Sequence, residues 1–271
     1  MTASTFNFSN CSLFGVAEVP DCERYAELEL HYMLSSYLHG ELYAKAAAFA
    51  ALQQDLSNSY IRKLYDEESY HADLFQQYLN RNYNLSSTQE ESYKELINTL
   101  HDLRPEISLL VLHLVIEPFG IGSLSYIKSR SNDDELNSFL SIVLKDETDH
   151  LAMTNKNKIY FDNFLNRQSE VTLKTIANFI DAATVAMKDA SCPRTLYSQF
   201  IQKDRIEEVH KMALKGSSSK MQIKYAYPVL FKARKTVPHL VPYLGQLKIL
   251  LTTTFSPNSL RYLCCNGALN V

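Results

Sequence analysis

Two short segments of this 271-residue chain place a glutamate three residues before a histidine, with apolar residues on their flanks. Glu68 precedes His71, and Glu147 precedes His150. Residues three apart in an α-helix lie about 60° apart around the helix axis, so both members of a pair can face one centre. Because carboxylates and imidazoles bind first-row metal ions, each pair predicts half of a metal site.

A further glutamate lies in the helix expected before each pair. Glu41 stands 27 residues before Glu68, and Glu117 stands 30 residues before Glu147. This repeated layout predicts two antiparallel helical hairpins whose four helices surround one centre. Four carboxylates and two imidazoles form a donor set suited to two iron or manganese ions. Bound cations would also offset the free-energy cost of burying these anions.

An acidic residue directly precedes each pair and is expected to orient a ligand. Asp146 is predicted to accept a hydrogen bond from His71, and Glu67 from His150, each across the bundle. The alternative is that all these groups form surface salt bridges on an ordinary helical protein. That alternative is disfavoured because Glu117 stands within LVIEPFGIG, a poor place for a solvated charge.

Other residues near the pattern have plainer interpretations. A third match, Glu207–His210, lies in the polar sequence QKDRIEEVHKM and is interpreted as a solvated helix face. His113, four residues before a predicted ligand, could be a seventh ligand, but a hydrogen-bonded core histidine is favoured. Tyr37 is expected to be a packing residue rather than a redox tyrosine. Pro118 is expected to bend or loosen its helix just after a ligand.

The elements that must position these residues are expected to be helical throughout. The chain has only 7 Gly and 8 Pro, and its helix-favouring residues occur in long runs, which predicts an all-α protein. Helices are expected over residues 21–56, 59–79, 88–103, 105–129, 132–165, 169–190 and 194–215. GSSSK at 216–220 is expected to be a flexible break, followed by short helical pieces over 221–271. The predicted domains are therefore 21–215, a helical bundle, and 216–271, a basic extension packed on it.

The ligand pattern resembles the ferritin-like di-iron carboxylate superfamily over residues 21–165. The resemblance implies a ferritin-like four-helix bundle with additional helices and a site for two iron ions, with an Fe/Mn or Mn/Mn pair as variants. It implies that the metal-binding and catalytic residues are Glu41, Glu68, His71, Glu117, Glu147 and His150. The set is most similar to oxygen-activating members such as aldehyde-deformylating oxygenase and acyl-carrier-protein desaturase. Val143 and Gly120–Ile121 depart from the N-oxygenase and desaturase patterns, so no subfamily is assigned.

The resemblance implies a non-haem di-iron oxygenase or oxidase with O2 as co-substrate. The substrate would be a small organic or acyl-type molecule, free or carrier-bound, and a ferredoxin or reductase would supply electrons. Two alternatives stay open: an iron-handling ferroxidase or peroxide scavenger, and a metal-free helical interaction protein. Against the iron-handling alternative, the chain has no rubredoxin-like cysteine cluster and is longer than a minimal storage subunit.

The C-terminal region has a charge unlike the rest of the chain. Residues 209–271 contain nine Lys and Arg and no Asp or Glu. This predicts either a lid over the bundle or a surface for an acidic partner protein, with an anionic membrane surface as a further option. No nucleic-acid partner is expected, and a homodimer is compatible with the pattern.

The expected location is cytoplasmic. The start, MTASTFNFSN, has neither a basic segment nor an apolar run, and the five Cys include no C-x-x-C. The apolar window 237–255 contains His239, Gln246, Lys248 and two prolines, so a membrane span is not expected there.

Overall fold

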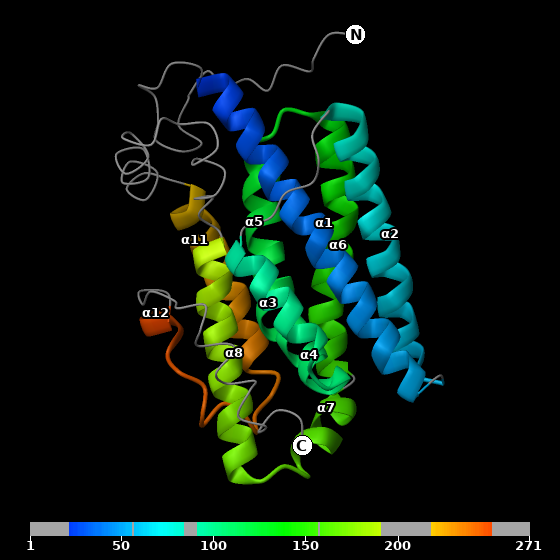
Figure 1. Cartoon of the computed structure of the whole chain (residues 1–271), viewed down its shortest axis with the longest axis vertical. Coiled ribbons are helices and arrows are strands. Elements are labelled where there is room, and N and C mark those ends of the chain that lie inside the picture. Colours follow the sequence, from blue (N-terminus) through cyan, green and yellow to red (C-terminus); the bar gives the residue numbers. More distant parts are fainter. Residues whose placement is uncertain (1–21, 56, 84–90, 157, 191–217, 251–271) are drawn as a thin grey trace.

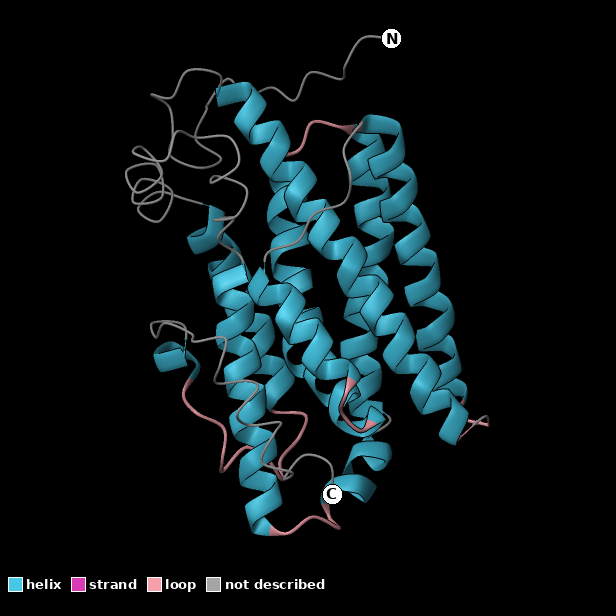
Figure 2. Ribbon diagram, viewed as in Figure 1, coloured by secondary structure: helices cyan, strands magenta, loops and turns pink. Residues whose placement is uncertain are grey.

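A computed structural model describes residues 22–55, 57–83, 91–156, 158–190 and 218–250. Every regular element in these ranges is a helix, which confirms the all-α prediction (Figure 2). The elements are α1 (Cys22–Gln54), α2 (Ser59–Asn82), α3 (Glu91–His101), α4 (Pro105–Val111), the π-helical segment η1 (Leu112–Ile116), α5 (Glu117–Arg130), α6 (Asp134–Lys156), α7 (Lys158–Leu165), α8 (Glu170–Ala190), α11 (Ser218–Arg234) and α12 (Leu247–Leu250).

Four long helical segments pack around one another. Helix α1 packs against α2, α2 against α6, and α6 against α5, while α4, which leads into η1 and α5, packs against α1. Helices α3, α8 and α11 lie on one side of this group (Figure 1). Helix α11 packs along α5, and α3 packs against α8.

Local signals in the sequence explain where these helices begin. The Asn58 side chain accepts a hydrogen bond from the Ile61 N–H at 3.2 Å and so caps α2. Asp133 does the same for α6, because its carboxylate accepts from the Leu136 N–H at 2.9 Å. Pro105 stands in the first turn of α4, where its missing N–H costs no hydrogen bond. These three helix starts agree with the sequence prediction.

The core consists of two apolar clusters, one toward each end of the four segments. In α1, residues 30–38 belong to one cluster and residues 43–52 to the other. In α2, residues 72–79 and 60–64 divide in the same way. Between the clusters lies a buried polar layer. It contains the six predicted ligands, Glu41, Glu68, His71, Glu117, Glu147 and His150.

One predicted boundary is wrong. The helix expected over 132–165 corresponds to α6 and α7, which lie on either side of Asn157, a residue outside the described ranges. The break expected at 216–220 is helical from Ser218, and α11 continues through Pro228 to Arg234 instead of forming short pieces. Tertiary packing explains this continuity, because Ala226 is fully buried against α5 while Pro228 is exposed. The predicted helix over 194–215, the Glu207–His210 match and residues 251–271 lie outside the described residues.

Among the described residues, one continuous helical stretch is long and apolar enough to cross a membrane by length and composition. It runs from Pro105 to Ser129, and 89% of its most apolar window is buried inside the structure. This stretch carries Glu117 in the polar layer. Such burial is the pattern of a core helix in a soluble protein.

Part of the basic C-terminal charge is neutralised within the protein. Arg234 is buried and forms a 2.8 Å ion pair with Asp181 of α8. Its guanidinium also donates hydrogen bonds to the Gly245 carbonyl and the Thr184 hydroxyl. Burial raises the pKa of Asp181, although the Arg234 charge opposes this rise. Arg234 is therefore a packing residue, and the exposed basic side chains of this region include Lys232 of α11 and Lys235, which directly follows α11.

The contact between α5 and α11 predicts opposite effects for two neighbouring glycines. A Cβ at Gly122 would lie 2.5 Å from Ala226 Cα, so Gly122→Ala must push the two helix backbones apart. We expect it to lower the free energy of unfolding by about 1–3 kcal/mol. A Cβ at Gly120 would lie 3.8 Å from its nearest neighbour, Tyr37 Cε1. Gly120→Ala should therefore raise stability by up to about 1 kcal/mol through helix propensity. Urea unfolding of both variants measures the difference, and equal effects would contradict the described packing.

Candidate metal centre

The structure brings the six predicted ligands into two overlapping clusters. The His71 cluster contains Glu41, Glu68, His71 and Glu147, and the His150 cluster contains Glu68, Glu117, Glu147 and His150. In each cluster one ligand atom from every residue lies within 4.8 Å of the others, and all these residues are buried. Glu68 and Glu147 belong to both clusters, so they stand between two potential cation positions.

The two shared glutamates direct different oxygens to the two histidines. Glu68 places Oε2 3.9 Å from His71 Nδ1 and Oε1 3.3 Å from His150 Nδ1. Glu147 places Oε1 3.4 Å from His71 Nδ1 and Oε2 3.8 Å from His150 Nδ1. This is the geometry of a carboxylate that bridges two ions.

The unshared glutamates each face one histidine. Glu41 Oε2 lies 3.4 Å from His71 Nδ1, and Glu117 Oε1 lies 3.6 Å from His150 Nδ1. Ligand atoms bound at about 2.1 Å to one cation lie roughly 3.0–3.4 Å apart in octahedral or tetrahedral geometry. The observed separations are close to that range, so modest side-chain adjustment would place a cation in each cluster.

Several buried atoms in the polar layer lack a hydrogen-bond partner. They are Glu68 Oε1, His71 Nδ1, Glu117 Oε1 and Glu147 Oε2. A buried polar atom left unsatisfied costs about 1–3 kcal/mol, and more if it is charged. Each of these atoms faces a cluster, so coordination of two cations would satisfy all four. The donor set and its unsatisfied atoms therefore fit a di-metal group.

The outer nitrogen of each histidine is held by a carboxylate of the opposite hairpin. His71 Nε2 lies 3.3 Å from Asp146 Oδ2, and His150 Nε2 lies 3.0 Å from Glu67 Oε2. Both contacts predicted from the sequence are present. Because an ionised carboxylate can only accept, Nε2–H donates, so Nδ1 is the nitrogen that would bind a cation once its own proton is released.

Without a cation, protons compensate the buried negative charge. Burial disfavours the charged form of His71, but its contacts with Glu147 and Glu41 outweigh burial and raise its pKa to about 12. The His150 pKa is also raised well above its usual value, because contacts with Glu117 and Glu147 outweigh burial. Burial and the neighbouring Glu147 charge raise the pKa of Glu68. Burial acts in the same direction on Glu147, but the two histidines overcome it and lower the Glu147 pKa to about 2.

His113 is a hydrogen-bonded core histidine, the alternative favoured by the sequence. Its Nδ1 lies 2.8 Å from Glu117 Oε2, and its Nε2 lies 2.5 Å from the Tyr60 hydroxyl. Neither cluster includes it. Tyr60 was not predicted to have any role, and nothing in the sequence signals one, because its contact joins residues 53 positions apart. Tyr37 stacks on Phe75 with ring centroids 5.8 Å apart, as expected of a packing residue.

The helix is loosened before Glu117 rather than after it, contrary to the prediction from Pro118. The Glu117 N–H bonds to the carbonyl of Leu112, five residues back, at the end of η1. A proline ring clashes with the carbonyl four residues before it, here that of Leu114. The wider π turn accommodates that clash, and the chain continues as α5 through Pro118.

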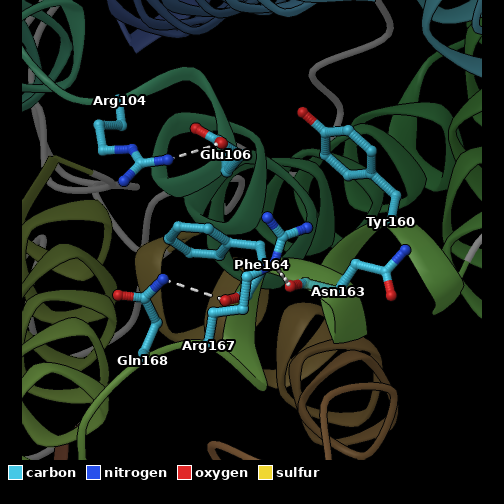
Figure 3. A pocket seen from close by; sticks show the side chains of 7 residues that line it. All are labelled: Arg104, Glu106, Tyr160, Asn163, Phe164, Arg167 and Gln168. Atoms are coloured by element: carbon cyan, nitrogen blue, oxygen red, sulfur yellow. Dashed lines mark hydrogen bonds and ion pairs between the residues drawn. The ribbon is translucent and has the colours of Figure 1, made fainter.

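A separate polar pocket of about 320 Å³ lies beside α4 and α7 (Figure 3). Its lining contains none of the six clustered residues. Arg104 in this pocket pairs with Glu106 at 2.9 Å and lies over the Phe164 ring at 5.2 Å. Arg104 is thus paired within the pocket wall, and the pocket contributes no ligand to the candidate metal centre.

No protein-family model, curated protein or solved structure matches this chain. The chemistry of the polar layer is therefore argued from its own geometry.

The raised pKa values predict that metal binding releases protons. Metal ligands must be deprotonated, whereas the raised pKa values of His71, His150 and Glu68 favour their protonated forms in protein stripped of metal. We expect the release of about two to three protons per chain, and an affinity for Mn²⁺ that rises with pH between about 6.5 and 8, since protons compete with the metal. Calorimetric titration in buffers of different ionisation enthalpy measures the number released. Release of fewer than one proton would contradict these protonation states.

Proposed function

We propose that this chain is a ferritin-like di-metal oxygenase or oxidase that binds two iron ions, or an iron/manganese or manganese pair, and uses O2 to oxidise a small organic or acyl-type substrate. The observation that carries the proposal is the division of oxygens by Glu68 and Glu147, each of which turns one oxygen to each histidine. Ion pairs on a protein surface stay in contact with water and do not require buried carboxylates that each face two histidines.

The donor set favours iron and manganese over other metals. Carboxylate oxygens suit Mn²⁺ and Fe²⁺, imidazole nitrogen suits iron, and no cysteine lies in either cluster. When bound in reduced form, such a metal pair would pass two electrons to O2, the substrate would supply the other two as it is oxidised, and a ferredoxin or reductase would restore the reduced metals. The ring of packed helices is consistent with a ferritin-like four-helix bundle in which each helix contributes a ligand.

The chain's own groups would orient the ligands and keep bulk water away. Asp146 and Glu67 fix the ring orientation of His71 and His150. The apolar clusters on both sides of the polar layer exclude bulk water, which strengthens electrostatic interactions inside it. A reactive oxidant generated there would be shielded from side reactions with solvent.

The proposal is tested by loading stripped protein with Fe²⁺ under anaerobic conditions. We expect about two iron ions per chain by elemental analysis, and O2 uptake that depends on an added fatty acyl substrate, free or attached to an acyl-carrier protein. His71→Ala should abolish the substrate-dependent O2 uptake and lower the iron content to about one ion per chain, because it removes a ligand from one of the two clusters. Asp146→Ala should weaken iron binding about 10–100-fold, because it removes only an orienting contact.

A matched control for these variants is Asp149→Asn, which changes an exposed acid of α6 between Glu147 and His150. It should bind iron like wild type. Iron oxidation at the same rate with and without the acyl substrate would favour an iron-handling protein instead. Less than one iron per chain after reconstitution would leave a metal-free interaction protein.

We further propose that the exposed face of α11 docks an acidic partner, either a carrier protein or the electron donor. Lys232 is exposed near the end of α11, and Lys235, exposed in the turn that follows, lies over the half-exposed Phe231 ring at 4.2 Å. Exposed basic and aromatic side chains together suit a partner with acidic residues around an apolar patch.

The docking surface predicts a salt-sensitive affinity for acidic proteins. A ferredoxin and an acyl-carrier protein should each bind more weakly as salt rises from about 50 to about 300 mM, because screening shortens the range of attraction. Lys232→Gln with Lys235→Gln should weaken binding further, whereas Arg81→Gln on α2 should not. Arg234 must be left intact, since it is buried against Asp181. Affinity independent of both salt and the two lysines would contradict docking at α11.

A further inference from the structure

The two halves of the metal centre differ in what holds their unshared glutamates. Glu117 has one oxygen, Oε2, 2.8 Å from His113 Nδ1, while its other oxygen faces the His150 cluster. A carboxylate can only accept a hydrogen bond, so His113 Nδ1–H donates. The Glu117 carboxylate is thereby held with Oε2 hydrogen-bonded to His113 and Oε1 facing the His150 cluster.

His113 is itself held on two further sides. The Tyr60 hydroxyl is hydrogen-bonded with its Nε2, and the Phe161 ring packs against it edge-on with centroids 5.7 Å apart. The side chains of His113 and Glu117 are 1% and 2% exposed, so water does not compete for the contact between them. The imidazole has little freedom to release the carboxylate.

The same position in the other half carries a residue of different chemistry. Tyr37 stands four residues before Glu41, as His113 stands four before Glu117. The Tyr37 hydroxyl hydrogen-bonds Ser123 of α5 instead, and its ring stacks on Phe75. Glu41 forms an ion-pair contact with His71 and a hydrogen bond with Glu68, both members of its own cluster.

From this asymmetry we propose that Tyr60 and His113 are positioning residues that make the His150 position the tighter of the two metal positions, and that the His71 position, with the freer Glu41, is the exchangeable one. This inference rests on the proposed di-metal function. A preorganised ligand loses less freedom on coordination, so the same four-ligand set binds more tightly where one carboxylate is already oriented. Glu41 would correspondingly lose more conformational freedom when it binds a cation.

Variants that each remove one histidine allow the Mn²⁺ affinity of each metal position to be measured alone. His71→Ala leaves the His150 cluster complete, and His150→Ala leaves the His71 cluster complete. Each stripped protein is titrated with Mn²⁺, and the electron paramagnetic resonance signal of the free ion reports binding. We expect one ion per chain in each case, bound at least 10-fold more tightly by the His71→Ala protein.

The role of His113 is then tested in both backgrounds. His113→Phe should weaken Mn²⁺ binding about 10–100-fold in the His71→Ala protein and less than about 3-fold in the His150→Ala protein. His113→Gln keeps an N–H donor and should recover most of the loss, which a purely structural defect would not allow. Tyr60→Phe should reproduce a smaller loss, and Tyr37→Phe, the matched control, should change neither background.

The outcomes distinguish this inference from the proposed function. Equal affinities at the two positions, or equal effects of His113→Phe in both backgrounds, would overturn the asymmetry while leaving the di-metal site intact. The same holds if Tyr37→Phe acts like His113→Phe. Failure of wild-type protein to bind any Mn²⁺ would overturn both. If His113→Phe does not fold, the Tyr60→Phe and His113→Gln titrations decide the question by the same comparison.

Discussion

The rest of the structure depends on one constraint, the burial of four carboxylates and two imidazoles between two apolar clusters. Ionised groups placed there repel one another and lose their hydration, which would cost several kcal/mol for each uncompensated charge. Protons on His71, His150 and Glu68 offset part of this cost, and bound cations would offset more. Apolar side chains at these six positions would pack the helices without the cost of burying charged groups. Retaining the charges is therefore best explained by the metal chemistry proposed for them.

Helix packing converts a repeated sequence layout into a site with two unequal halves. The shared glutamates belong equally to both clusters, and each histidine is oriented by an acid of the opposite hairpin. The inequality arises outside the ligand set, where His113 and Tyr60 hold Glu117 while Tyr37 turns to Ser123. The π turn before Glu117 adds a second difference, because α1 runs through Glu41 as an uninterrupted α-helix.

Helix α11 affects the polar layer because it packs against α5, the helix that carries Glu117. Gly122 allows α11 to approach the α5 backbone about one and a half turns after Glu117, so α11 supports the helix that carries a predicted ligand. Arg234 and His239 of the basic region meet Asp181 and Asp162 of the body at 2.8 and 3.3 Å. The charge asymmetry of the sequence thus partly serves attachment of this region, and the exposed lysines of α11 are what remains for a partner.

The sequence by itself determined the helical class, most helix starts and the six residues that converge in the polar layer. These features follow from short-range rules, namely the 3.6-residue period, capping side chains and the three-residue spacing of Glu and His. It also determined the partners of the histidine outer nitrogens, because residue order around a helix fixes which side chains face inward. Only the tertiary structure decided which oxygen of Glu68 and Glu147 faces which histidine, that Tyr60 supports His113, and that Arg234 is buried. It also decided that α11 continues through Pro228 and that the turn before Glu117 widens. Each of these depends on contacts between residues far apart in the chain, whose distances and orientations no local pattern specifies.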